Sequence, residues 1–111
     1  MTDWIWTSPT ARKRHRCHMC WRIILPGETY WRMAGLDHGQ AWTYKACPHC
    51  YRAAAAFSRQ RAEEEWEDEV ILEWLEDEHP ALWASLRAGW RYPDGELLPL
   101  PAFQPRCEVA A

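Results

Sequence analysis

The sequence predicts a small α+β fold, and three observations lead to that prediction. Two C-x-x-C pairs, Cys17 with Cys20 and Cys47 with Cys50, are separated by 26 residues. The residues between the pairs contain turn signals and alternate aromatic with polar side chains, as a β-hairpin does. An alanine-rich run follows the second pair, and apolar residues at helical spacing come after it, which is typical of an amphipathic helix.

The two C-x-x-C pairs indicate a bound metal ion. Two residues between the cysteines allow a tight turn to direct both thiolates toward one point, and two such turns complete a tetrahedron around Zn²⁺. We therefore predict a structural zinc ion with four thiolate ligands, which leave no open position for a reacting water. The predicted ligands are Cys17, Cys20, Cys47 and Cys50. The alternative is two reduced pairs with a redox role, but a redox C-x-x-C usually stands in a βαβ context, which this sequence lacks.

Length and cysteine usage limit the kind of protein. A chain of 111 residues forms one domain, or a small metal module with a helical extension, and a core of that size often needs a staple such as a metal. Five cysteines, an odd number, at metal-type spacing favour a reducing compartment. No signal-peptide pattern is visible, and no apolar run approaches the roughly 18 residues that cross a bilayer. We therefore expect a cytoplasmic protein.

A β-hairpin is expected between the cysteine pairs, over about 29–45. The dipeptide Pro26-Gly27 is a strong turn signal before it, and the run 36–39 supplies the turn within it. Ahead of the first pair, Trp4 and Trp6 fall on one face of a short extended segment. Either they pack on the domain, or the segment is loose and becomes ordered on a partner.

A helix is expected to start at Pro48, since a proline in the first turn loses no intrahelical hydrogen bond. It continues to about Glu78, either as one helix or as two with a break near 58–61. A short second helix is expected over 81–88, with Gly89 as its stop. Beyond it we expect an irregular tail whose apolar side chains pack on the helices, namely Leu97, Leu98, Leu100 and Phe103. The chain thus divides into a basic arm (1–16), a metal module (17–57), a helical extension (58–89) and a Pro-rich tail (90–111).

The order of a cysteine knuckle, a β-hairpin and a helix bearing the second cysteine pair resembles the treble-clef zinc-finger family. The resemblance covers about 16–57, roughly a third of the chain, and it implies four cysteine ligands to zinc. The motif C-x-x-C-W-R-x-I-x-P-G-E-x-Y is also similar to small zinc proteins found in phages and other mobile elements. The fold hosts many functions, so it implies none by itself.

We expect no enzymatic activity. Asp37-His38 invites comparison with HNH nucleases, which can share a treble-clef core. However, only eight residues separate His38 from Cys47, and no Asn or second His follows at a useful place. The metal and base constellation of a nuclease therefore cannot be assembled, and His38 is interpreted as a turn residue.

The charge pattern suggests two binding surfaces. Residues 1–61 carry 10 Lys and Arg against 3 Asp and Glu, while residues 62–111 carry 3 against 13. A one-signed acidic helix indicates a basic partner surface, such as the nucleic-acid groove of another protein. Its candidate protein-binding residues are Glu63, Glu64, Trp66, Glu67, Asp68 and Trp74. Alternatively, the acidic stretch docks on the basic module of the same chain or of a second copy, so a homodimer is also possible.

The basic half suggests direct contact with nucleic acid, because cations beside aromatics suit phosphate contacts and stacking on unpaired bases. The candidate residues are Arg12, Lys13, Arg14, Arg16, Arg22 and Arg52. The simpler interpretation is a solvated run that offsets the negative charge of the four-thiolate zinc site. Our preferred hypothesis is a non-enzymatic, phage-type inhibitor or adaptor that binds a protein of the nucleic-acid-handling machinery, and direct DNA or RNA binding is the alternative.

Overall fold

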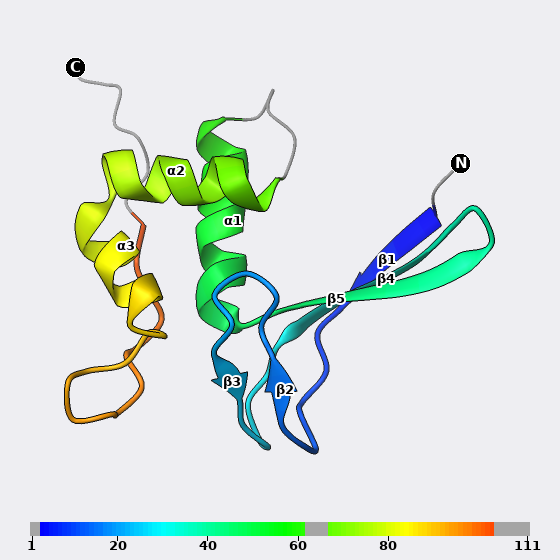
Figure 1. Ribbon diagram of the computed structural model, residues 1–111, viewed down its shortest axis with the longest axis horizontal. Helices are drawn as coiled ribbons and strands as arrows, with labels where there is room; N and C mark the ends of the chain where they lie inside the picture. The colour runs from blue at the N-terminus through cyan, green and yellow to red at the C-terminus, as the bar shows by residue number, and fades with distance from the viewer. Residues whose placement is uncertain (1–2, 62–66, 104–111) are drawn as a thin grey trace. The chain divides into compact units, whose positions relative to one another are not determined.

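A computed structural model of the chain describes residues 3–61 and 67–103. The chain divides into two compact units, Met1–Tyr51 and Arg52–Ala111. Helix α1 (Pro48–Gln60) runs through the boundary. The described residues form the predicted small α+β fold, with strands in the first unit and three helices from Pro48 onward (Figure 1).

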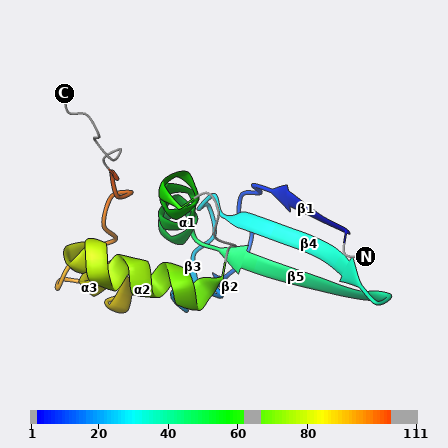
Figure 2. The same cartoon turned by 90° about the horizontal axis from the view of Figure 1, so that it is seen from above.

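The first unit is built on a three-stranded antiparallel sheet. Strand β4 (Trp31–Asp37) lies between β1 (Asp3–Thr7) and β5 (Gln40–Ala46), as Figure 2 shows from above. The predicted hairpin is confirmed by the pairing of β4 with β5, in which Met33 lies opposite Tyr44. Because side chains alternate between faces along a strand, this register places Trp31, Met33 and Tyr44 on one face of the sheet.

The N-terminal segment supplies the third strand of that sheet. In the β1–β4 register Trp6 lies opposite Met33, so it joins the aromatic face. Its ring meets that of Trp31 edge-on at 6.5 Å between centroids and that of Tyr51 at 5.8 Å. Trp31 stacks on Tyr51 at 3.9 Å. Of the two expectations for this segment, packing on the domain is therefore the one the structure shows for Trp6.

The hairpin turn has the conformation that its sequence favours. His38 and Gly39 have φ values of 52° and 80°, and two successive left-handed residues define the tight turn whose twist matches antiparallel strands. His38 is exposed and acts as a turn residue, as predicted.

Two short strands carry the first cysteine pair. Strand β2 (His15–Arg16) pairs with β3 (Ile23–Ile24), and the loop between them contains Cys17 and Cys20. Ile24 is fully buried. Its burial anchors this small hairpin in the core of the first unit.

Helix α1 ends at Gln60, and α2 (Asp68–Glu78) is a separate helix. Of the two alternatives left open for the stretch from Pro48 to Glu78, the structure shows two helices. The amphipathic pattern predicted for α2 is also confirmed, because Ile71, Trp74 and Leu75 are buried. None of the helices in the described ranges has both the length and the apolar character needed to cross a membrane.

Trp74 is buried in the core of the second unit. Its ring meets Phe57 edge-on at 5.5 Å and stacks on Phe103 at 5.9 Å, so the predicted packing of Phe103 is confirmed. Helix α3 (Pro80–Arg87) follows α2 after His79. The predicted packing of Leu100 is wrong, because this residue is 44% exposed.

Helix α3 ends as the sequence predicts. Gly89 has a φ of 71°, a left-handed conformation that glycine adopts at little cost. The N–H of Gly89 donates to the carbonyl of Leu86 at 2.9 Å, and the N–H of Trp90 donates to that of Ser85 at 2.6 Å. These two bonds satisfy carbonyls that the end of the helix would otherwise leave without partners.

Candidate metal centre

The structure brings the four predicted cysteine ligands together. Cys17 and Cys20 lie in the loop between β2 and β3, Cys47 directly precedes α1, and Cys50 lies in the first turn of α1. Their four Sγ atoms all lie within 4.8 Å of one another, and the Sγ atoms of Cys20 and Cys47 are 3.8 Å apart. A tetrahedron with Zn–S bonds of about 2.3 Å has edges of about 3.8 Å. None of the four forms a disulfide, so the cluster has the size and chemistry of a zinc site.

Backbone N–H groups point at the sulfur atoms. The N–H of Cys20 lies 3.5 Å from the Sγ of Cys17, and the N–H of Cys47 lies 3.3 Å from the same sulfur. The N–H of Cys50 lies 3.4 Å from the Sγ of Cys47. Hydrogen bonds of this kind stabilise the ionised form of a thiol, which is the form that binds a metal. The local backbone is therefore arranged for thiolates.

The ionisation of the four thiols is coupled. A hydrogen bond from the Cys20 thiol lowers the pKa of Cys17, and its partnership with Cys17 raises the pKa of Cys20. Burial opposes ionisation of Cys47, but hydrogen bonds from the other three thiols outweigh it and lower its pKa. The pKa of Cys50 is raised, first by Cys17. Four thiolates this close repel one another, and a divalent cation would remove that conflict.

The histidines inside the two cysteine pairs lie outside the ligand set. The Nδ1 atom of His18 accepts a hydrogen bond from the backbone N–H of Lys45 at 3.0 Å, and the N–H of His18 donates to the carbonyl of Lys45 at 2.8 Å. His18 therefore ties the first cysteine loop to the end of β5. His49 is buried, with its Nδ1 atom 3.4 Å from Nη2 of Arg22. Both residues help to align the elements that carry the cysteines.

Arg22 lies inside the first unit, which corrects its place among the candidate nucleic-acid contacts. It is 6% exposed, and its guanidinium forms a two-pronged ion pair with Glu28. Nη2 lies 2.9 Å from Oε1, and Nη1 lies 3.2 Å from Oε2. Nη1 also donates to the carbonyl of Ile23 at 3.1 Å. A side chain held in this way cannot reach a phosphate group.

Arg22 also interacts electrostatically with Cys47 of the cysteine cluster. Burial works against its charge, but the hydrogen bond to Glu28 and the negative charge of Cys47 outweigh burial and raise the pKa of Arg22. Burial likewise opposes ionisation of Glu28, yet the bond from Arg22 outweighs it and lowers the pKa of that carboxyl. Glu28 also accepts from the N–H of Leu25 at 2.8 Å. Arg22 thus couples the turn at Pro26-Gly27 to the metal centre and offsets part of its negative charge.

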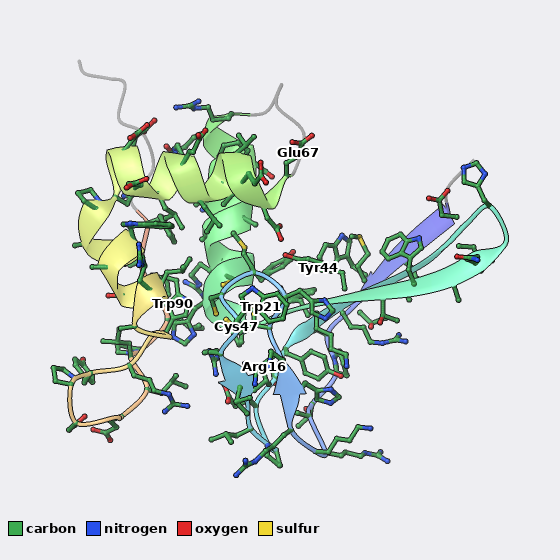
Figure 3. The ribbon with its side chains drawn as sticks, viewed as in Figure 1. Arg16, Trp21, Tyr44, Cys47, Glu67 and Trp90 are labelled. Atoms are coloured by element: carbon green, nitrogen blue, oxygen red, sulfur yellow. The ribbon has the colours of Figure 1, made fainter. Side chains whose placement is uncertain are left out.

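The other basic candidates are on the surface. Four of them precede the first cysteine pair and are exposed, namely Arg12, Lys13, Arg14 and Arg16. The fifth, Arg52, is also exposed. Arg16 is directed by a hydrogen bond from its Nη1 atom to the carbonyl of Trp21, at 2.7 Å (Figure 3). Arg52 belongs to the second unit. The exposure of Trp21 itself was not predicted, because a tryptophan in so small a chain is expected to lie in the core.

The candidate protein-binding residues divide into three groups. Glu63, Glu64 and Trp66 lie outside the described residues. Glu67 is exposed at the start of α2 (Figure 3) and Asp68 is half-buried. Trp74 is 2% exposed and belongs to the core of the second unit, which corrects its expected place on a binding surface.

Comparison of the chain with protein-family models, with curated proteins and with solved structures gives no match. The cysteine cluster and the charged surfaces are therefore the features from which a function is inferred.

Proposed function

We propose that this chain is a non-enzymatic treble-clef zinc protein that binds a protein of the nucleic-acid-handling machinery, as a phage-type inhibitor or adaptor would. The ligand arrangement supports the treble clef: one cysteine pair lies in a short hairpin and the other lies at the start of a helix. Four thiolates close the coordination sphere of zinc, so the metal's contribution is to hold these elements together. The working compartment would be the reducing cytoplasm.

The acidic side of α2 carries the proposal of a protein partner. Glu69, Glu73, Glu76 and Asp77 are exposed, and their spacing of three, four and eight residues puts them along one side of the helix. The helix contains no Lys or Arg. Its opposite side is packed through Ile71, Trp74 and Leu75. The helix is therefore anchored by one side and presents charge of a single sign on the other.

The acidic residues of the first turn suit the helix dipole, and Glu78 pairs with Arg61 at 2.6 Å, but the rest of this charge arrangement disfavours the helix. Acidic residues four apart repel each other, as Glu69 with Glu73 and Glu73 with Asp77. Acidic residues in the last turn also oppose the helix dipole, which favours cations there. A surface that costs local stability indicates a selected interaction with an oppositely charged partner. A basic nucleic-acid groove on another protein has that chemistry.

Neutralising acidic residues in the last turn of α2 is expected to raise the stability of the second unit and to weaken its binding to a basic partner. The double variant Glu76→Gln, Asp77→Asn should stabilise the second unit by about 0.3–1 kcal/mol per residue, because it relieves repulsion and the unfavourable dipole interaction. The same variant should lose binding to a basic surface. Thermal unfolding measures the first effect. The second is measured by how well the chain displaces labelled duplex DNA from purified, sequence-nonspecific DNA-binding proteins.

The control is Glu96→Gln, which removes an exposed acidic residue from the tail and should leave displacement unchanged. Failure of the unaltered chain to displace the duplex from any such protein would contradict the proposed partner class. Equal displacement by the double variant would show that α2 is not the binding surface.

Direct contact with nucleic acid is the second candidate function, and one observation favours it. The cations Arg12, Lys13, Arg14 and Arg16 are all exposed, although they lie within five residues of one another and next to the folded cysteine loop. The structure therefore leaves a dense basic run available to solvent. Such a run binds phosphates with an affinity that falls as salt rises.

Charge reversal of the basic run tests this second function. The triple variant Arg12→Glu, Lys13→Glu, Arg14→Glu should abolish binding to generic DNA and RNA and should spare displacement by the acidic surface. Fluorescence anisotropy over a salt series provides the measurement, with a steep fall in affinity expected for the unaltered chain. Arg59→Glu, an exposed cation on α1, is the control. No binding by the unaltered chain at low salt would contradict direct nucleic-acid contact.

A further inference from the structure

Trp21 has an unusual combination of exposure and backbone conformation. The residue is 61% exposed, and its φ is 66°, which lies in the left-handed region that glycine favours. In the described ranges two other non-glycine residues have a positive φ, and both have a local explanation. His38 completes the hairpin turn, and Trp90 is 1% exposed and therefore held by packing.

Neither packing nor backbone geometry accounts for a tryptophan at position 21. A bulky residue in the left-handed region is strained relative to glycine, so the backbone alone would favour glycine. Exposure of the ring leaves most of its apolar area in water, so the hydrophobic effect gives little in return. Strain that persists without a structural benefit is a sign of a functional position.

The backbone of Trp21 is held on both sides. Its N–H donates to the carbonyl of Cys17 at 3.0 Å, which closes the turn around the first cysteine pair. Its own carbonyl accepts the bond from Nη1 of Arg16. Figure 3 shows Trp21 and Arg16 in the same region of the first unit. The ring is thus carried by a turn that the metal centre stabilises, with a guanidinium fixed beside its backbone.

We propose that Trp21 is a stacking platform for an unpaired base of a single-stranded nucleic acid, with Arg16 contacting the adjoining phosphate. The chemistry fits in three respects. Every base has a π-face that can stack on an aromatic ring. A rigid ring loses little conformational entropy on binding. Arginine is the side chain best suited to a phosphate beside a stacked base. The inference rests on the second candidate function and adds that the target strand is unpaired.

The substitution Trp21→Gly tests the proposal without risk to folding, because glycine adopts the observed φ freely. We expect the variant to unfold at the same temperature as the unaltered chain or higher, and to bind oligo-dT about tenfold more weakly or worse. Trp21→Phe should retain most of the affinity, since it keeps an aromatic ring. Binding to a blunt duplex of matched length should be weaker than to oligo-dT in the unaltered chain and should change little in either variant.

The outcomes separate this inference from the function on which it rests. Oligo-dT binding that is lost with the Arg12, Lys13, Arg14 reversal but unchanged in Trp21→Gly would overturn the stacking role and leave the basic run as the contact. Equal losses of single-stranded and duplex binding in Trp21→Gly would also overturn it. No nucleic-acid binding by the unaltered chain would overturn both. Loss of DNA displacement by Trp21→Gly in the protein-partner assay, with oligo-dT binding intact, would assign the ring to a protein interface and overturn stacking on a base.

Discussion

Cys47→Ser is expected to abolish the folded form of the first unit. Structural zinc sites contribute about 10–16 kcal/mol to the folding of small metal modules, more than the total stability of most domains of this size. Cys47 is fully buried, as are Cys17 and Cys50, and a hydroxyl in place of the sulfur is a poor zinc ligand. Removal of the metal by a chelator should have the same effect.

Native mass spectrometry provides the direct measurement. The unaltered chain should carry one divalent ion, and the dispersed NMR signals of β4 and β5 should collapse when the ion is removed. Cys107→Ser is the matched control, because this cysteine is outside the proposed ligand set, and it should keep both the ion and the dispersed spectrum. A native mass equal to that of the bare chain, or a Cys47→Ser variant with unchanged unfolding temperature, would contradict the metal centre.

Arg22→Met is expected to cause the second-largest loss of stability. Breaking a buried ion pair by removing one partner costs about 3–5 kcal/mol, because it leaves Glu28 partly buried without its counter-charge. The same change removes the hydrogen bond to the carbonyl of Ile23 and the positive charge beside Cys47. We therefore expect a lower unfolding temperature together with easier loss of the metal to a competing chelator.

Two further variants distinguish the ion pair from simple packing. Arg22→Lys keeps the charge but cannot form the two-pronged contact, so its stability should be intermediate. In Arg22→Met combined with Glu28→Gln, the uncompensated carboxylate is gone and part of the loss should be recovered. If Arg22→Met is as stable as the unaltered chain and binds nucleic acid less well, Arg22 contacts the ligand rather than the metal centre.

The pair also predicts how the effect of Arg22→Met changes with pH. The folded-state pKa of Glu28 is below its ordinary value, so the pair stabilises the fold above the carboxyl's unfolded pKa and loses this contribution as pH falls through the folded value. The difference in unfolding temperature between Arg22→Met and the unaltered chain should therefore be largest near neutral pH and shrink in acid.

Features that depend on a few adjacent residues could be predicted. The C-x-x-C spacing lets each pair direct two thiolates to one point, and this local geometry does not depend on how the rest of the chain folds. His38-Gly39 and Gly89 have local conformational preferences, and these match the turns observed. The helical spacing of the apolar residues after the alanine-rich run was enough to indicate an amphipathic helix, and Ile71, Trp74 and Leu75 form the packed side of α2 in the structure.

Features that depend on residues far apart in the chain could not be predicted. From the sequence Arg22 is one more candidate surface cation, and its burial beside His49, 27 residues away, is seen only in the fold. The local sequence likewise does not distinguish Trp21, which is 61% exposed, from Trp90, which is 1% exposed. The pairing of β1 with β4 likewise requires a partner strand more than 20 residues away.

The sequence by itself therefore determined which four cysteines form a cluster, where the hairpin lies and which stretches are helical, because backbone preference and cysteine spacing act over short stretches of chain. Only the tertiary structure decided which charged and aromatic side chains are available to a partner, because burial is a property of what the rest of the chain places around a residue.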